Sequence, residues 1–357
     1  MSPLLLLLLP LASAFSLKAV KEEFEAFKAK FRPLGYANAE EENFRFGVFT
    51  KSFERIQELN ELNGQKAFGI NAMADRTQAE RFQRGRKGYG DKDSKGAQTH
   101  SPELSSLPDS KDWRIEDPIP VTPVKNQGQC GSCWAFSTIE TVESGYIMAG
   151  GRPQLFSPQQ VASCVESVDG CGGGDTVTAF KYLSGVVGLS SAWYWPYLQG
   201  MTPLNSCTDK ACTKACDKNL TELATEETFI GPYGQVTGFE YATDPCYESC
   251  NKQNLTKLAA SLVEKVPFPS ASTPACGTAT RARVSSHPKP VARLATMILT
   301  TACSLSGMFN ASAPTPYWIV RNSWATSWGI EGYIHLEMTE NTCGLADEAT
   351  LAKLKGV

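Results

Sequence analysis

The sequence predicts an α+β protein in three successive parts: a short leader, a charged helical segment, and a two-domain unit that is helical first and β-rich afterwards. Two patterns predict the helical parts, one in residues 41–60 and one directly after Cys133. The β-rich part is expected from a resemblance carried by two motifs, which are described below. With 357 residues the chain is long enough to bury a large core and to hold two or more domains.

The chain opens with an apolar run, Leu4–Leu11, followed by the small residues Ala12-Ser-Ala14. This pattern is typical of a secretory signal peptide, although no Lys or Arg precedes the apolar run. We therefore interpret residues 1–14 as a signal peptide. The run is too short to span a bilayer, and no later segment is long enough. These features predict the secretory pathway, with the lysosome, the vacuole or the extracellular fluid as destination.

Residues 15–106 are predicted to form a separate, highly charged helical segment. Within residues 41–60 a Glu, an Arg, a Phe, a Ser, an Ile and an Asn recur three or four positions apart, which places them on one helix face. On spacing alone this could be an ordinary amphipathic helix. A second ordered motif, Gly69-Ile-Asn-Ala-Met-Ala-Asp75, follows it. The stretch 84–110 is rich in Gly, Lys, Ser and Asp, as expected for an exposed linker.

The most informative motif is Val124-Lys-Asn-Gln-Gly-Gln-Cys-Gly-Ser-Cys-Trp134. It places Cys133 directly before an apolar run in which residues 135, 139, 142 and 146 share one helical stripe, and Gly150-Gly151 ends the run. A thiol at a helix N-terminus is stabilised as the nucleophilic thiolate by the helix dipole. The alternative is a structural disulfide cysteine at a tight turn, the default for a lone cysteine in a secreted chain.

These eleven residues resemble the papain family of cysteine proteases, most closely its cathepsin L-like branch. The resemblance implies that Cys133 is the nucleophile and that the side-chain amide of Gln127 helps to form the oxyanion hole. Tyr317-Trp-Ile-Val-Arg-Asn-Ser-Trp-Ala-Thr-Ser-Trp-Gly329 resembles the second signature of the family. There, Asn322 would orient the catalytic histidine and Trp324 would shield that hydrogen bond from water.

The resemblance extends along most of the chain, with small departures. Ala325 stands where the family usually has glycine, Ser52 replaces an asparagine, and Met73 replaces an aromatic residue. Residues 15–106 are similar to the family's inhibitory propeptide, and residues 107–357 to its peptidase domain. The implied fold has a helical left domain, a β-barrel-like right domain and an active-site cleft between them.

Gly170-Cys-Gly-Gly-Gly174 resembles a further landmark of the family's left domain. Gly173 and Gly174 match backbone positions that pair with an extended substrate peptide. Glycine suits this role because no side chain blocks the approach of another backbone. A plain turn beside a disulfide is compatible with the same role.

Twelve cysteines fit an oxidising compartment. The resemblance implies two disulfides, Cys130–Cys171 and Cys164–Cys207. Residues 198–250 are longer than the family norm and add two C-x3-C pairs, at 212 and 216 and at 246 and 250, while Cys343 is also left to pair. Because the spacing is not C-x2-C, we predict disulfides rather than a metal site, and no cofactor. Sequons at Asn219, Asn254 and Asn310 predict glycosylation.

The formal charge of -3, without any basic run, argues against a nucleic-acid partner. The expected partners are protein and peptide substrates, the chain's own propeptide as an inhibitor, and cystatin-like inhibitors. The resemblance is to enzymes that act without a second subunit, so we expect a monomer.

One essential group is absent from this sequence. The chemistry needs an imidazole to hold Cys133 as a thiolate and to protonate the leaving amine. The chain has three histidines: His100 in the linker, His287 in a Pro-rich context, and His335 after the Asn322 motif in a predicted strand. The family's histidine lies in a short strand shortly before the asparagine, where this chain reads Met297-Ile-Leu-Thr-Thr-Ala302.

Residues 266–303 are rich in Pro, Ser, Thr, Ala and Arg, and no strand pattern runs through them. We interpret them as frame-shifted. When each codon starts at the old third base, residues 267–274 permit a Val-Ser-Val-Cys-Val-Asp-Ala strand. Residues 297–303 then permit Asp-Leu-Asp-His-Cys-Val, whose histidine straddles Thr300 and Thr301, 21 positions before Asn322. Cys276 and Cys303 would then be artefacts.

Two hypotheses follow from this reading. The first is a cysteine endopeptidase zymogen whose recorded sequence carries a compensated frameshift. The second is a pseudoprotease that keeps the cleft to bind peptides or inhibitors. As literally written the chain is predicted to be inactive, because loss of one member of a catalytic unit removes most of its rate. A Pro-rich stretch in place of strands is also predicted to unfold the right domain.

Overall fold

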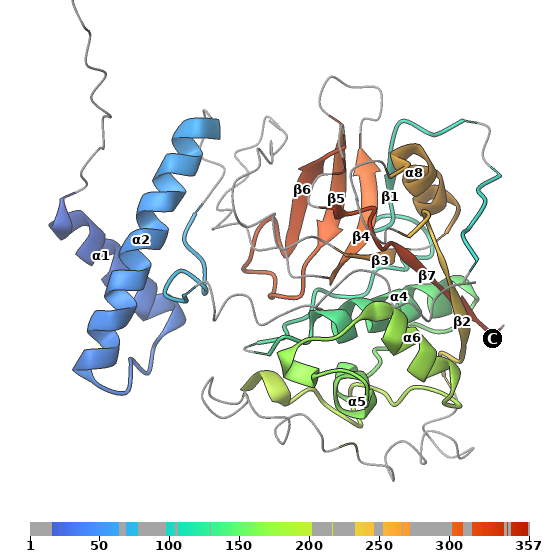
Figure 1. The fold of residues 1–357 in the computed structure, drawn as a ribbon, viewed down its shortest axis with the longest axis horizontal. Coiled ribbons are helices and arrows are strands. Elements are labelled where there is room, and N and C mark those ends of the chain that lie inside the picture. Colours follow the sequence, from blue (N-terminus) through green and yellow to red (C-terminus); the bar gives the residue numbers. More distant parts are fainter. Residues whose placement is uncertain are drawn as a thin grey trace, which may run out of the picture.

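The computed structural model consists of a helical pair and a larger body of helices and antiparallel strands (Figure 1). The structure describes residues 16–63, 69–77, 98–103, 106–128, 130–201, 216, 233–245, 253–265, 267–271, 302–309, 316–338, 341 and 344–355.

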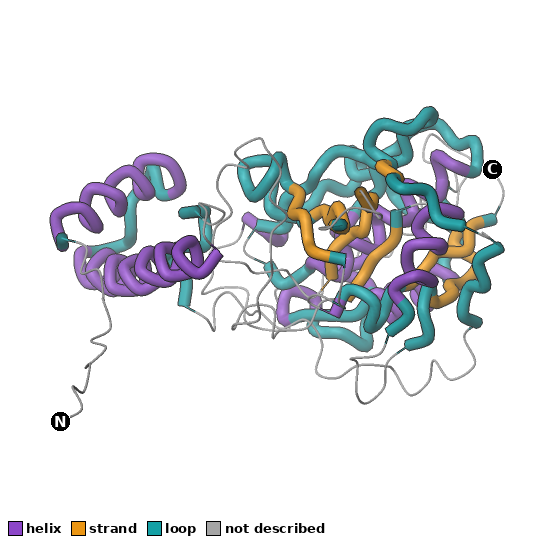
Figure 2. Tube along the Cα trace, turned by 90° about the horizontal axis from the view of Figure 1, so that it is seen from above, coloured by secondary structure: helices purple, strands orange, loops and turns teal. Residues whose placement is uncertain are grey.

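The helical pair consists of α1 (Leu17–Phe31) and α2 (Ala39–Asn63), which cross each other beside the larger body (Figures 1 and 2). Ser16 caps α1, since its side chain accepts a hydrogen bond from the Ala19 amide at 3.2 Å. The contact between the helices is apolar and rich in phenylalanine. Its buried members are Val20, Phe24, Phe27, Phe49, Phe53 and Ala74.

The helix face predicted in residues 41–60 is confirmed. Arg45, Phe49, Ser52 and Ile56 all lie on α2 and are at most 7% exposed. The second motif packs beside it, because the Arg45 side chain donates to the carbonyl oxygen of Asp75 at 3.3 Å. The two ordered motifs of the N-terminal segment therefore form one folded unit.

The helical half of the larger body is built on α4 (Cys133–Met148), α5 (Pro158–Cys164) and α6 (Thr176–Ser184), which lie together below the strands in Figure 1. Two short 3₁₀ turns, η2 (Gly170–Gly172) and η3 (Gln199–Met201), follow α5 and α6. The β-rich half adds α8 (Leu255–Glu264), which Asn254 caps through its side chain. Side-chain caps by Ser157 and Asp175 explain where α5 and α6 begin.

The strands form one five-stranded antiparallel sheet and one two-stranded ribbon. The sheet order is β1 (Lys111–Asp112), β4 (Ala302–Phe309), β5 (Tyr317–Arg321), β6 (Tyr333–Glu337), with β3 (Phe268–Ala271) also paired to β4. The ribbon joins β2 (Val236–Tyr241) to β7 (Thr350–Leu354). The predicted α+β fold of a helical and a β-rich half is thus confirmed, with an open sheet rather than a closed barrel among the described strands.

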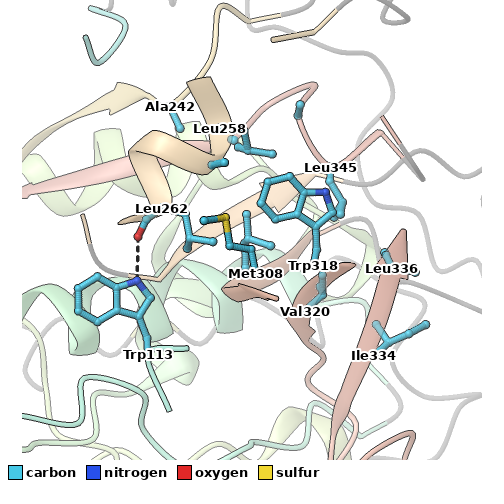
Figure 3. Close-up of a cluster of buried hydrophobic side chains, with 14 of the residues drawn as sticks. Trp113, Ala242, Leu258, Leu262, Met308, Trp318, Val320, Ile334, Leu336 and Leu345 are labelled. Atoms are coloured by element: carbon cyan, nitrogen blue, oxygen red, sulfur yellow. Dashed lines mark hydrogen bonds between the residues drawn. The ribbon is translucent and has the colours of Figure 1, made fainter. Parts of the chain in front are cut away.

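A large hydrophobic cluster lies at the centre of the β-rich half (Figure 3). It joins α8 to the sheet through Leu258, Leu262, Met308, Trp318 and Leu336, each at 0% exposed. Trp113 closes the cluster from below, and its indole nitrogen donates to the carbonyl oxygen of Leu262 at 2.8 Å (Figure 3). A buried indole that finds such a partner avoids the cost of an unmade hydrogen bond.

The expectation that no strand runs through residues 266–303 is wrong at both ends of that stretch. Residues 268–271 form β3, and residues 302–303 begin β4, so the two ends pair with each other in antiparallel register. Tertiary pairing with β4 overrides the poor strand propensity of Phe-Pro-Ser-Ala here. Within the described part of the chain, no helix is both long and apolar enough to cross a membrane.

Candidate active site

Cys133 is the first residue of α4, as predicted. It carries a thiol rather than a disulfide, and it is 2% exposed. The predicted stripe of residues 135, 139, 142 and 146 is buried in the helical half of the body. The helix ends at Met148, just before Gly150. Ser132 precedes the helix without capping it, so its side chain leaves the positive end of the helix dipole beside the thiol.

The Ser132 side chain instead contacts the hydroxyl group of Tyr197, an interaction that the sequence did not predict. The Ser132 and Tyr197 hydroxyl oxygens lie 2.6 Å apart, and the Tyr197 hydroxyl donates to the backbone oxygen of Gln127 at 2.9 Å. Burial raises the pKa of Tyr197 above its usual range, and the neighbouring Cys133 adds to the rise. The phenol therefore stays neutral and links the segment before Cys133 to Gln127.

Gln127 is buried and held on both sides. Its side-chain amide nitrogen donates to the carbonyl oxygen of Cys130 at 2.8 Å, and its amide oxygen accepts a hydrogen bond from the Ser323 hydroxyl. Its backbone nitrogen donates to the Ser323 carbonyl oxygen at 2.8 Å. An amide nitrogen carries two hydrogens, so the bond to Cys130 leaves one to donate to an oxyanion.

Asn322 directly precedes Ser323 and directly follows β5. Its backbone nitrogen donates to Gly332 at 3.0 Å, its side-chain oxygen accepts from the Ser323 amide at 2.8 Å, and it is 1% exposed. Trp324 is half-buried, pairs with Asn126 through an isolated antiparallel bridge, and stacks edge-on against Trp328. The two motifs predicted from sequence therefore lie side by side, joined residue by residue.

Ala325 has a backbone φ of 62°, the left-handed region that favours glycine. The departure from the family pattern matters at this position because alanine is held in a backbone conformation that glycine adopts without steric cost. The turn is kept because the Ala325 amide donates to the carbonyl oxygen of Lys125 at 2.9 Å.

The glycine loop lies against the Cys133 helix. Gly173 has φ 122°, and a Cβ on Gly174 would lie 2.3 Å from the ring of Trp134. The Trp134 indole nitrogen donates to the Gly170 carbonyl oxygen at 3.2 Å. Each glycine is therefore favoured locally, Gly173 by its backbone conformation and Gly174 by its close packing on Trp134. The loop thus lies beside the residue that follows Cys133.

One predicted disulfide is confirmed and the other is wrong. Cys130 bonds Cys171 as expected, which ties the glycine loop to the segment before Cys133. Cys164 bonds Cys216 instead of Cys207. The cost of closing a loop changes little between these two separations, so spacing could not decide between neighbouring cysteines in the long stretch 198–250. Cys207, Cys212, Cys246, Cys250 and Cys343 lie outside the described residues.

Neither described histidine stands beside Asn322. His335 stacks on Tyr317, at the far end of β5, and five extended positions separate Tyr317 from Asn322, about 16 Å. His100 contacts Glu264 and Glu240, at 3.0 Å and 3.6 Å. His287, Thr300 and Thr301 lie outside the described residues, as do the sequons at Asn219 and Asn310. In the described part of the chain, no three His, Cys, Asp or Glu residues are grouped as metal ligands.

Comparison with known proteins agrees with this geometry. Residues 107–353 match the papain family cysteine protease domain, which covers more than half of the chain. The chain belongs to the papain family of cysteine proteases. Residues 24–81 match the cathepsin propeptide inhibitor domain, so this papain-family protease is a zymogen with its own inhibitor. The predicted family and enzyme class are confirmed.

Named relatives and solved structures support the same assignment. The oryzain gamma chain of Oryza sativa is 30% identical over 315 residues, covering 87% of this chain and 78% of that protein. The thiol protease aleurain of Arabidopsis thaliana is 30% identical over 316 residues, with the same coverage of 87% and 78%. A digestive procathepsin L proteinase from Tenebrio molitor superposes with a TM-score of 0.68 at 27% identity, covering 94% of this chain and 100% of that one.

Proposed function

We propose that this zymogen cleaves internal peptide bonds through the Cys133 thiolate. The thiolate attacks the substrate carbonyl carbon, while the Gln127 side chain and the Cys133 backbone N–H stabilise the oxyanion. A histidine protonates the leaving amine, and water then hydrolyses the acyl-enzyme. Asn322 orients that histidine, Trp324 shields their hydrogen bond, and the loop at Gly173 and Gly174 pairs with the substrate backbone.

A single observation carries these roles. Gln127 is bonded both to Cys130, three residues before the nucleophile, and to Ser323, directly after Asn322. One side chain therefore spans the two motifs that the chemistry needs together. No cofactor takes part in this proposal, because the nucleophile and the oxyanion donors are groups of this chain and the proton carrier is the histidine of the shifted reading frame.

The missing histidine belongs, in this proposal, at the position of Thr300 and Thr301 in the shifted reading frame. The strand register supports that place. Ser304 of β4 pairs with Arg321 of β5, and the strands are antiparallel. The residues before Ser304 therefore run beside those after Arg321, the first of which is Asn322. A histidine two or three positions before Cys303 falls at the same end of the sheet as Asn322.

We further propose the domain boundaries expected from sequence: a signal peptide at 1–14, an inhibitory propeptide at 15–106 and the peptidase at 107–357. The paired motifs of α2 and the Asp75 turn support the propeptide as a folded inhibitor.

The two disulfides fit passage through the secretory pathway, with the lysosome, the vacuole or the extracellular fluid as destination. Asn254 supports glycosylation, because it is exposed and its capping bond uses the side-chain oxygen and leaves the nitrogen available.

The partners of the mature enzyme are, in this proposal, peptide substrates and cystatin-like inhibitors that enter the same cleft, and the enzyme acts as a monomer. Nothing in the chemistry requires a second subunit, since every group named above lies on one chain.

The test begins by resequencing the transcript and its genomic locus across the codons for Leu262 to Phe309. Two secreted proteins are then compared: the chain as written, and the chain with the shifted-frame reading of residues 267–303. We expect thiol-dependent peptide hydrolysis from the second protein only, and its loss in a matched Cys133→Ala variant.

Other outcomes would overturn the proposal in distinct ways. Hydrolysis by the chain as written would show that the histidine at 300–301 is unnecessary. A folded but inert shifted-frame protein would refute the proposed catalytic roles and turn attention to peptide or inhibitor binding in the cleft.

A further inference from the structure

Glu140 is a buried carboxylate that the proposed mechanism does not use. It lies two helical turns after Cys133 on α4 and is 2% exposed. One of its oxygens lies 3.1 Å from the Arg321 Nε, and the same oxygen accepts a hydrogen bond from the Ser304 hydroxyl at 2.6 Å. Three separate elements, α4, β5 and β4, therefore meet at one carboxylate.

Each of these elements contains a position of the proposed active site or lies directly beside one. Helix α4 begins with Cys133, Arg321 is the last residue of β5 and directly precedes Asn322, and Ser304 follows the proposed histidine position by three or four residues. Ser304 and Arg321 are also direct partners across the sheet. The carboxylate thus connects all three elements.

Arg321 extends this connection to the oxyanion side. Its Nη1 donates to the carbonyl oxygen of Thr122 at 2.6 Å, in the segment that leads to Gln127. The same segment is anchored to α4 a second time, because Lys125 donates to Glu143 at 2.6 Å. Two buried carboxylates on α4 therefore face one buried cation, Arg321, and one partly buried cation, Lys125, and the charges balance.

Stability alone does not explain such a pair. Removing two charges from water is costly, and an apolar pair of similar volume stabilises a core equally well or better. The Arg321 guanidinium is attached at Nη1 by the hydrogen bond to Thr122 and at Nε by the ion pair with Glu140, and two separate points of attachment restrict its direction more than apolar packing does. The arrangement therefore suits the holding of a neighbour in one orientation.

We propose that Glu140 is a positioning residue: it fixes Arg321, and through it Asn322, relative to the helix that carries Cys133. Without the carboxylate, Arg321 loses the contact that joins β5 to α4. Asn322 still follows Arg321 in the sequence, but its position relative to the Cys133 thiol is no longer fixed. The kinetic part of this proposal rests on the proposed function, whereas the structural part stands independently.

The first measurement is kinetic, on the activated enzyme that contains the histidine. We expect Glu140→Gln to lower kcat by about tenfold or more while KM changes by less than about twofold, since orientation and not substrate binding is lost. The double variant Glu140→Val with Arg321→Met should recover thermal stability but not kcat. Leu183→Ala, a buried left-domain variant outside this network, should lose stability and keep kcat.

The second measurement needs no activity. Hydrogen–deuterium exchange of the full chain as written should show faster exchange in Glu140→Gln over residues 121–128 and 317–326, and unchanged exchange in α6. Recovery of kcat together with stability in the double variant, or unchanged exchange in those two segments, would overturn the proposal. If no protein hydrolyses peptide, the proposed function fails, and the exchange result alone decides the role of Glu140.

Discussion

Asp347 gives a pH dependence of stability that can be worked out from the structure. The residue is 1% exposed, and one carboxylate oxygen accepts a hydrogen bond from the Asn341 side chain at 2.6 Å. The other oxygen is buried without a hydrogen-bond partner among the described residues. Burial raises the pKa of Asp347 from 3.8 to about 6, against a smaller opposing effect of the Asn341 hydrogen bond.

The direction follows from the raised value. The folded protein binds this proton more tightly than the unfolded chain, so the stabilisation is complete below pH 3.8 and is lost as the pH rises through about 6. At about 1.4 kcal/mol per pKa unit the full effect is about 3 kcal/mol, of which about 2 kcal/mol falls between about pH 4.5 and about pH 7.5. We therefore expect greater stability in acidic compartments.

The perturbation is Asp347→Asn, which keeps the shape and removes the titration. The free energy of unfolding is measured by urea titration at about pH 4.5 and about pH 7.5, and the two proteins are compared at each pH so that other groups cancel. Relative to the wild type, the variant should gain about 2 kcal/mol from the lower to the higher pH. Asp169→Asn, at an exposed carboxylate, serves as the control. An equal difference at both pH values, or one of opposite sign, would refute the reasoning.

Three further predictions concern backbone strain, the linker and the glycine loop. Ala325→Gly should raise the free energy of unfolding by about 0.5–1 kcal/mol, because glycine adopts φ 62° without steric cost, and a lower value in urea titration would contradict this. His100→Gln should speed trypsin cleavage of the linker about fivefold, since it removes contacts with Glu240 and Glu264; an unchanged rate by mass spectrometry would argue against that anchor. Gly174→Ala should cost about 1–3 kcal/mol and slow alkylation of Cys133, because the Trp134 ring must move; unchanged melting and alkylation would show that the loop adapts.

Local patterns in the sequence were sufficient to predict the centre of the site. The apolar stripe after Cys133 predicted a helix that begins at the thiol, and the structure has α4 at that place. The Gly-Cys-Gly-Gly-Gly run predicted a turn beside a disulfide, and Cys171 bonds Cys130 in that turn. These predictions succeeded because each rests on neighbours a few positions apart.

The contacts that the sequence did not predict are long-range. Tyr197 joins Ser132 to Gln127, and Arg321 reaches Glu140 across 181 positions. No periodicity links such residues, since their proximity is created only by the packing of α4 against the sheet. The partner of Cys164 was missed for the same reason, because several cysteines in one long stretch are nearly equivalent in loop entropy.

The described ends of the Pro-rich stretch, residues 267–271 and 302–303, are part of a folded β-rich half, contrary to the sequence-based expectation of unfolding. Among the described strands β3 pairs with β4 alone, so Pro269 can lie in it without an N–H to donate to a second neighbour. The shifted frame reads a Val- and Ser-containing strand at the same place. Both readings therefore supply β3, and the fold alone does not distinguish them.

The residues around the missing histidine do distinguish them. Packing alone does not require a thiol at the start of α4, where serine would occupy nearly the same volume, nor a glutamine held on one side by Cys130 and on the other by Ser323. Burying polar groups costs free energy unless they are hydrogen-bonded, and the bonds that Gln127 makes to Cys130 and Ser323 also hold it in one geometry. In the proposed mechanism this arrangement serves acyl transfer, and the proposed histidine position directly precedes β4. In the proposed reading, two compensating base changes, one near Val266 and one near Ser304, restore an imidazole there and complete the proposed site.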